Sequence, residues 1–384
     1  MTSIRPPTTH IVLMDGTFAS LDDGRRSSIG RIHRLLTGQL SLPPTDARHR
    51  IHYGIGQQWN RWRTLPELVM GVTLETRIIH AYSWLASGYR QGDRIFMFGY
   101  SRGAFASRSL AGMICRIGLL KPEYATERNV RLAWRYYQKG GSETSMAAFR
   151  RRRCQPDAGV DMVGCFDTVM ALGIRLPLLW MLTEPRFRFH DAHLGPGIRN
   201  AFQALALDET RAAFSPLLWD GDWEGDEADD RIEQMWFRGS HPDIGGQLSG
   251  FEFARPLSNI PLTWMLERAE NVGLELPVGW RGLFPCDADA PSIGTWRNWG
   301  KAFLARTPRI AGRHLSEKLH SSVGMPYVGH AQLVNHLSQD EDPVPVSDIG
   351  SAGRTVQATA SNAAFGRTPK AEQTSRVSSG RFRV

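Results

Sequence analysis

Cysteine is scarce in this sequence of 384 residues, with four in all and no Cys-x-x-Cys pair. This scarcity excludes a small disulfide-stabilised fold and a cysteine-based zinc site, and it suits a reducing compartment. Long apolar runs are also missing, because no stretch approaches the roughly 18–20 residues that a membrane-spanning helix needs. The first ten residues lack the apolar core of a secretory signal peptide. We therefore expect a cytoplasmic protein, or one exported without a cleavable signal peptide.

Lysine is rare as well, since only five of the 46 basic residues are lysine and the rest are arginine. The net charge of +8 is unevenly placed, because residues 351–384 alone carry +5. The rest of the chain is nearly balanced, which argues against a nucleic-acid partner. Residues 338–384 hold few large apolar side chains and predict a disordered basic tail after a folded domain at 1–337. Because it is basic, such a tail could contact the surface of an anionic membrane, so we keep peripheral membrane contact as an alternative to a nucleic-acid partner.

Short apolar runs alternate with stretches of helical spacing over the first 270 residues. The expected strands are 9–14, 49–55, 94–98, 160–166 and 232–237. One expected helix follows a cap at Ser27-Ser28, and the others cover 66–90, 104–117, 122–153 and 261–272. This alternation predicts an α/β fold with a mostly parallel sheet and helices on both faces. Residues 174–230 depart from the alternation, and we expect a helical insertion or lid there, with a helix near 198–207.

The segment Gly99–Gly103 has the pattern G-x-S-x-G between an expected strand and an expected helix. In a nucleophile elbow the serine sits on a strained turn, the flanking glycines avoid clashes, and the hydroxyl projects above the sheet. The N-terminus of the following helix favours developing negative charge. We therefore predict that Ser101 is a nucleophile, and an ordinary structural turn is the alternative.

A serine nucleophile needs a general base, and the base needs an acid that orients it. In α/β-hydrolases the chain order is Ser, then Asp or Glu, then His, with these groups just after strand ends. Asp167 and His241 each follow an expected strand and are the candidate acid and base. Asp167 could instead only cap a helix. Asp243 is the rival acid and His330 the rival base.

Ester hydrolysis by this route also needs hydrogen-bond donors for the oxyanion of the tetrahedral intermediate. We expect the backbone N–H of Arg102, the residue after the nucleophile, to supply one of them. The loop at Gly16-Thr17, directly after the first strand, is expected to supply another. This chemistry calls for no metal and no organic cofactor.

Two other features have two interpretations each. The carboxylates Asp208 and Glu209 could hold a cation, but we expect a solvent-facing helix on which they pair with Arg211. The apolar run Leu176–Leu182 could be a lid that dips into a lipid surface, or one more core helix.

Five motifs occur in a fixed order along the chain. They are Asp15–Thr17 (D-G-T), Gly92–Phe105 (compared with G-D-x-I-x-x-F-G-F-S-R-G-A-F), Val163–Val169 (V-G-x-W-D-T-V), Ala204–Arg211 (A-L-A-L-D-E-R-R) and Trp236–Gly246 (W-F-P-G-x-H-S-D-I-G-G). Together they resemble the catalytic domain of the first family of type VI secretion lipase effectors. The resemblance covers about 9–246 and is patchy to about 336. Four departures from the motifs remove no catalytic group: Phe166, Thr210, Pro242 and Gln247.

This resemblance implies an α/β-hydrolase fold and an esterase that acts on lipids through an acyl-enzyme. Phospholipids are the substrates of the effector branch, which favours A-type phospholipase activity. The resemblance also implies a triad of Ser101, Asp167 and His241, the same set that chain order selects. A partner from a secretion apparatus, or an immunity protein, is a further expectation. The alternatives are a soluble small-ester or thioester hydrolase and a non-catalytic binding module of the same fold.

Overall fold

The computed structural model describes residues 5–40, 42, 48–56, 72–169, 194–219, 229–297, 300–301, 303–334 and 337–339. In this part of the chain, seven parallel strands form one sheet in the order β2-β1-β3-β4-β5-β6-β8. Their bounds are β1 Thr9–Met14, β2 His49–Gly54, β3 Arg94–Tyr100, β4 Met162–Phe166, β5 Ala201–Ala206, β6 Ile232–Phe237 and β8 Glu317–Leu319. The short strands β7 (Ile310–Ala311) and β9 (Gln332–Leu333) pair separately.

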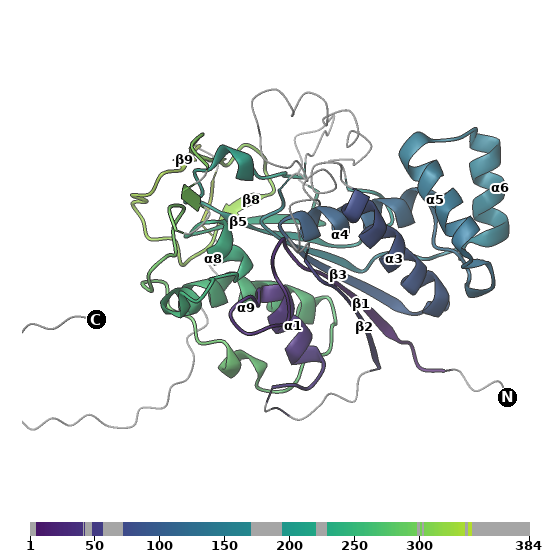
Figure 1. Ribbon diagram of the computed structural model, residues 1–384, viewed down its shortest axis with the longest axis horizontal. Helices are drawn as coiled ribbons and strands as arrows, with labels where there is room; N and C mark the ends of the chain where they lie inside the picture. The colour runs from purple at the N-terminus through teal and green to yellow at the C-terminus, as the bar shows by residue number, and fades with distance from the viewer. Residues whose placement is uncertain are drawn as a thin grey trace, which may run out of the picture. The chain divides into compact units, whose positions relative to one another are not determined.

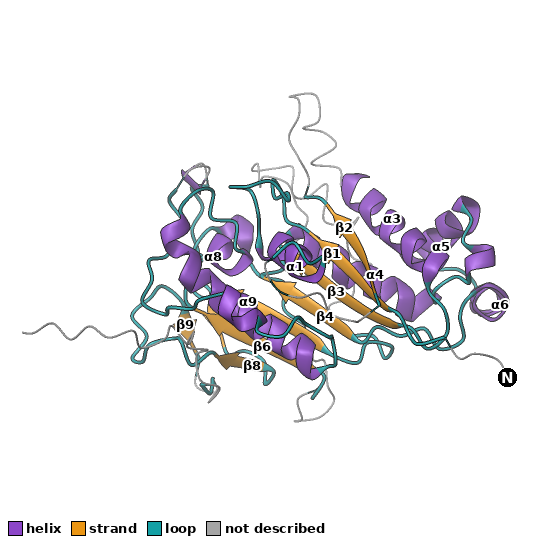
Figure 2. Cartoon of the chain, turned by 90° about the horizontal axis from the view of Figure 1, so that it is seen from below, coloured by secondary structure: helices purple, strands orange, loops and turns teal. Residues whose placement is uncertain are grey.

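Helices cover both faces of the sheet (Figures 1 and 2). The α-helices are α1 Ser28–Leu36, α3 Val72–Gly88, α4 Arg102–Ile117, α5 Glu127–Lys139, α6 Glu143–Arg153, α8 His241–Gly245 and α9 Arg255–Asn271. The 3-10 turns are η2 Pro122–Tyr124, η4 Ala212–Phe214, η5 Glu252–Ala254 and η6 Trp280–Leu283. Because side chains alternate along a strand, Val12 packs with the α3–α4 side while its neighbour Ile11 packs with the α1–α9 side.

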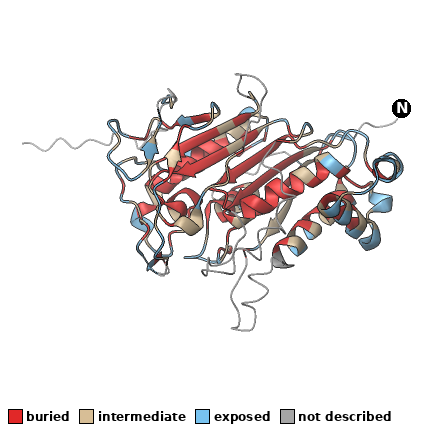
Figure 3. Ribbon diagram, turned by 90° about the horizontal axis from the view of Figure 1, so that it is seen from above, coloured by how far each residue is buried: buried red, intermediate tan, exposed pale blue. Residues whose placement is uncertain are grey.

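Burial follows this layering (Figure 3). The inner strands β1, β3, β4, β5 and β6 are almost wholly buried, and most of α4 is buried too. The edge strand β2 is partly exposed, and α5 and α6 turn one side outward. Small residues such as Ala104, Ala106 and Ala111 face the sheet and its covering helices, which lets α4 lie close to the strands. Among the described residues, the structure contains no helix with the length and apolar character to cross a membrane.

The predicted α/β class with a mostly parallel sheet is confirmed. The helix expected near 198–207 is wrong, because residues Ala201–Ala206 form β5 in the middle of the sheet. This run is buried on both faces, and the spacing of apolar residues cannot distinguish such a strand from a buried helix. Most of the expected lid, including Leu176–Leu182, lies outside the described residues.

The expected tail boundary at 338 can be examined only at its first two residues. The carbonyl of Ser338 accepts a hydrogen bond from the amide of Leu319. The side chain of Gln339 donates to the carbonyls of Ser321 and Val323. These two residues therefore belong with the folded part, and the rest of the predicted tail lies outside the described residues.

Candidate active site

Ser101 lies on a sharp turn between β3 and α4, at the carboxyl edge of the sheet. Its φ of +57° is strained for a residue that carries a side chain. A Cβ atom at Gly99 would lie 2.4 Å from the Cα of Ala104, and one at Gly103 would lie 2.1 Å from the carbonyl oxygen of Met14. The pattern G-x-S-x-G is therefore required here, because β1, β3 and α4 approach too closely for larger residues.

We expect Gly103→Ala to lower the free energy of unfolding by about 1–3 kcal/mol, because the methyl group must displace backbone atoms. Thermal unfolding of the purified proteins measures the effect. Gly282→Ala is the matched control, since a Cβ there meets no atom within 4 Å. Equal melting temperatures for the two variants would contradict the close approach described here.

Asp167 and His241 follow β4 and β6 and meet Ser101 at the same edge of the sheet. The Oγ of Ser101 lies 3.0 Å from Nε2 of His241, and Nδ1 of His241 lies 2.5 Å from Oδ2 of Asp167. All three residues are buried. The structure thus brings the three predicted side chains into one hydrogen-bonded row of hydroxyl, imidazole and carboxylate. This geometry is the one a nucleophile with an oriented base requires.

Asp167 has a second partner, the buried guanidinium of Arg309. Nη1 of Arg309 donates to Oδ1 at 2.6 Å, and Nη2 donates to Oδ2 at 2.9 Å. The same arginine donates to the carbonyls of Ala206 and Phe214, which hold it in place. Burial alone would raise the pKa of Asp167, but the charge of Arg309 and the hydrogen bond from His241 hold that pKa well below its usual range. Asp167 is therefore an anion.

The imidazole of His241 sits between the rings of Tyr100 and Phe214, with centroids 4.9 and 4.8 Å away. Burial lowers the pKa of His241, and the opposing effect of Asp167 does not restore it to the usual value. The hydrogen bonds assign the ring proton to Nδ1, which donates to Asp167. The unprotonated Nε2 then faces Ser101. At neutral pH the side chain is therefore in the state that a general base needs.

The lowered pKa of His241 predicts the acid side of the pH profile. Protonation of His241 removes the base, so activity falls only as the pH drops through its folded-state pKa. Because this pKa lies below 6.5, kcat/KM on a soluble ester should be half-maximal at a pH below 6.5. A steady-state pH series with circular dichroism at each pH checks this. If kcat/KM were already half-maximal at pH 7 or above, His241 would not be the titrating base.

The loop after β1 carries the other expected oxyanion donors. The amide of Gly16 donates to Oδ1 of Asp15 at 2.8 Å, so it points to that carboxylate. Asp15 is buried, also accepts from Ser27 and Tyr53, and has its pKa raised to about 6 by burial. It anchors the loop against α1 and β2. Of the two loop amides, that of Thr17 is the one this contact leaves for an oxyanion.

Arg102 is the first residue of α4. Amides in the first turn of a helix have no acceptor within the helix, and they carry the positive end of its dipole. The position directly after the nucleophile thus combines an available N–H with a favourable field. Burial lowers the pKa of the Arg102 side chain to about 10, which leaves it charged at neutral pH.

The rival acid and base lie elsewhere. Asp243 caps α8, where it accepts from the backbone and hydroxyl of Ser240, and it also accepts from the amide of Ile293. This capping role is the one its position two residues after His241 suggests. His330 is exposed on the segment between β8 and β9.

The solvent-facing helix expected at Asp208 and Glu209 is wrong. Residues 207–209 leave β5 in a turn, and Glu209 is buried. The expected pair with Arg211 is present, because Nε and Nη2 of Arg211 donate to the two carboxylate oxygens of Glu209 at 2.8 and 2.6 Å. The same carboxylate also accepts a hydrogen bond from the backbone amide of His241 at 3.2 Å. Glu209 thus fixes the start of α8. Among the described residues, no group of three or more histidine, cysteine or acidic side chains could hold a metal.

Arg309 and Glu209 are the site residues that sequence reasoning missed. Glu209 stands out in the sequence, but the helix expected there places it on the surface. Arg309 precedes a two-residue strand and is one of 41 arginines, so neither composition nor spacing distinguishes it. The need for Arg309 becomes visible only in the folded structure, because the carboxylate of Asp167 is buried there and a buried carboxylate needs a cationic partner.

Comparison with known proteins gives partial matches of three kinds. "Uncharacterized protein YEL023C" of Saccharomyces cerevisiae is 31% identical over 168 residues, which is 41% of this chain and 23% of that protein. A solved structure of an uncharacterized Pseudomonas aeruginosa protein has a TM-score of 0.40 at 16% identity and covers 72% of this chain and 47% of that one. The Tle1 effector bound to the VgrG spike of the type 6 secretion system has a TM-score of 0.31 at 18% identity. This match covers 63% of this chain and 51% of that one.

The chain spans about a quarter of the yeast protein and about half of each solved chain. The family match covers more than half of the sequence. Residues 8–268 match the family described as "T6SS, Phospholipase effector Tle1-like, catalytic domain", and this range contains Ser101, Asp167 and His241. The chain belongs to this family of Tle1-like phospholipase effector catalytic domains.

Proposed function

We propose that this protein is a serine esterase that cleaves the carboxylic esters of phospholipids by A-type hydrolysis. The observation that carries the proposal is the row Ser101–His241–Asp167, set on a strained elbow at the carboxyl edge of a parallel sheet. Membership of a phospholipase effector family supports lipid esters as the substrate class. Together these favour an esterase over a binding module, because a binding surface requires no oriented base.

In the proposed reaction, His241 accepts the proton of Ser101 as the hydroxyl oxygen attacks the ester carbonyl. Asp167 keeps the imidazole in the Nδ1–H form and stabilises the imidazolium that results. The amides of Arg102 and Thr17 donate to the oxyanion, and each such donor is worth about 2.7–4 kcal/mol in acyl transfer. The imidazolium returns its proton to the leaving alcohol. Water, activated by His241, then cleaves the acyl-enzyme and releases the fatty acid.

Incubation with phosphatidylcholine–phosphatidylethanolamine vesicles, followed by mass spectrometry of the lipids, tests the substrate class. We expect equal amounts of free fatty acid and lysophospholipid, with neither product formed by Ser101→Ala. A p-nitrophenyl ester assay run in parallel reports the esterase chemistry alone. Unchanged lipids with an active p-nitrophenyl ester assay would exclude the phospholipase and favour a soluble small-ester hydrolase. The absence of both activities would reject the esterase.

A further inference from the structure

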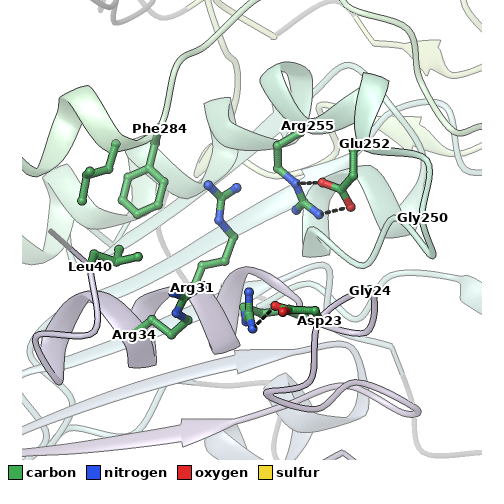
Figure 4. Close-up of a pocket in the computed structure, with 11 residues that line it drawn as sticks. Asp23, Gly24, Arg31, Arg34, Leu40, Gly250, Glu252, Arg255 and Phe284 are labelled. Atoms are coloured by element: carbon green, nitrogen blue, oxygen red, sulfur yellow. Dashed lines mark hydrogen bonds and ion pairs between the residues drawn. The ribbon is translucent and has the colours of Figure 1, made fainter.

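A cavity of about 470 Å³ opens between α1, the loop before it and the start of α9 (Figure 4). The charged side chains that line it are Asp23, Arg26, Arg31, Arg34, Glu252 and Arg255. Leu40, Leu283 and Phe284 form an apolar wall. The volume falls within the range of small-molecule sites, and the lining has the usual combination of apolar walls and a few converging polar groups.

The two carboxylates of this arginine cavity are already paired. Oδ1 of Asp23 lies 2.5 Å from Nη2 of Arg26. Arg255 donates to both carboxylate oxygens of Glu252, from Nε at 2.8 Å and from Nη2 at 2.9 Å. Four guanidinium groups and two carboxylates leave a net charge of +2. Within the described ranges, neither Arg31 nor Arg34 forms an ion pair, so the excess charge belongs to them.

Arg31 is the central group of the arginine cavity. Its side chain rises from α1, and Figure 4 shows its guanidinium between Phe284 and Arg255. One nitrogen donates to Asn259 at 2.5 Å, and the guanidinium carbon lies 4.8 Å from the Phe284 ring centroid. Burial, followed by the charge of Arg255, lowers the pKa of Arg31 to about 9, which leaves it a cation at neutral pH. Glu252 also acts on this charge, but within the described ranges no carboxylate forms an ion pair with Arg31. A half-buried cation without such a pair is costly, and a bound anion would offset that cost.

We propose that the arginine cavity binds a phosphate-bearing ligand. Guanidinium groups reach the cavity from α1, from the loop before α1 and from α9, so they surround an anion from several sides. This arrangement suits a tetrahedral phosphate, and arginine is the preferred side chain for phosphate oxygens. The apolar wall would take the organic part of a phosphoester. Arg255 also donates to the carbonyl of Gly246, directly after α8, so the cavity adjoins the helix that carries His241.

Isothermal titration calorimetry with glycerol 3-phosphate, at pH 7 and low chloride, tests this proposal without any activity measurement. We expect saturable binding of one molecule per chain, at least tenfold weaker in Arg31→Gln. Arg116→Gln is the matched control, because it removes the charge of an exposed helical arginine on α4. Acetate at equal ionic strength should bind at least tenfold more weakly than glycerol 3-phosphate. If Arg31→Gln fails to fold by circular dichroism, Arg34→Gln, which is expected to weaken binding at least threefold, decides the question.

A second measurement separates a free phosphoester from a lipid headgroup. Sedimentation with phosphatidylcholine vesicles, with and without phosphatidic acid, is run on Ser101→Ala with and without Arg31→Gln. Arg31-dependent sedimentation without glycerol 3-phosphate binding would assign the ligand to lipid headgroups. Glycerol 3-phosphate is also the headgroup end of phosphatidic acid, so its binding assigns the ligand to soluble phosphoesters only where sedimentation does not depend on Arg31. Both signals together would assign the ligand to lipid headgroups. The proposal would be overturned if neither glycerol 3-phosphate binding nor sedimentation depended on Arg31 or Arg34. It would also be overturned if acetate bound as tightly as glycerol 3-phosphate.

Discussion

His241→Ala and Asp167→Asn should each reduce kcat on a soluble ester by about 10⁴–10⁶-fold, the loss measured in triad hydrolases of known mechanism. In the first variant no base is left to accept the Ser101 proton, and in the second the imidazole loses the acceptor that fixes its tautomer. Adding either change to Ser101→Ala should cost almost nothing more, since the three groups act as one unit. Single- and double-variant kinetics on one ester measure this non-additivity.

His330→Ala is the matched control for the histidine change, because this residue is exposed and should leave kcat unchanged. Circular dichroism establishes that each variant is folded. An inactive His330→Ala beside an active His241→Ala would reverse the assignment of the base. Independent, additive losses in the double variants would show that the three residues do not work together.

Arg309→Gln should lower the free energy of unfolding by about 3–5 kcal/mol, the usual cost of breaking a buried ion pair. The guanidinium holds Asp167 through two hydrogen bonds, so its loss also frees the acid to move. Without this positive charge, the carboxylate acts more strongly on His241 and raises the pKa of the imidazole. The acid limb of the kcat/KM profile should therefore shift to higher pH. Arg309 acts through Asp167 and is a positioning residue.

Two further variants separate this positioning role from a general loss of stability. Arg309→Lys keeps the charge and should restore the acid limb toward its original pH, although a single ammonium cannot reproduce the bidentate pair. Arg268→Gln breaks a comparable bidentate pair with Glu233, away from the triad. It should lower the melting temperature without moving the pH profile. If Arg309→Gln is folded and its kcat/KM has the same pH profile as the wild type, Arg309 has only a structural role.

The sequence predicts the parts of the site where local chemistry is unusual. The elbow is recognisable because a serine between two glycines, placed after an apolar run and before a helix, is typical of a nucleophile and of few ordinary turns. Asp167 and His241 are recognisable because parallel strands end at one edge, so residues after different strands meet there. In the structure β4 and β6 place them within hydrogen-bond distance of each other, with β5 between the two strands.

The remaining features depend on tertiary contacts that no local pattern records. Ala201–Ala206 resembles a helix in its spacing, and only its place between β4 and β6 makes it a strand. Arg309 is 142 residues from Asp167, and its role exists only once β5 and η4 present their carbonyls to it. The misplaced Glu209 follows from the same error, because a run taken for a helix turns its carboxylates outward.

Labelling by a fluorophosphonate probe is the most direct test of the central claim that Ser101 is an activated nucleophile. Mass spectrometry of the digested protein locates the modified residue. We expect a single phosphonylated serine, Ser101, with labelling abolished in Ser101→Ala and slowed at least 100-fold in His241→Ala. An unlabelled folded protein, or labelling that persists at another serine in Ser101→Ala, would contradict the account.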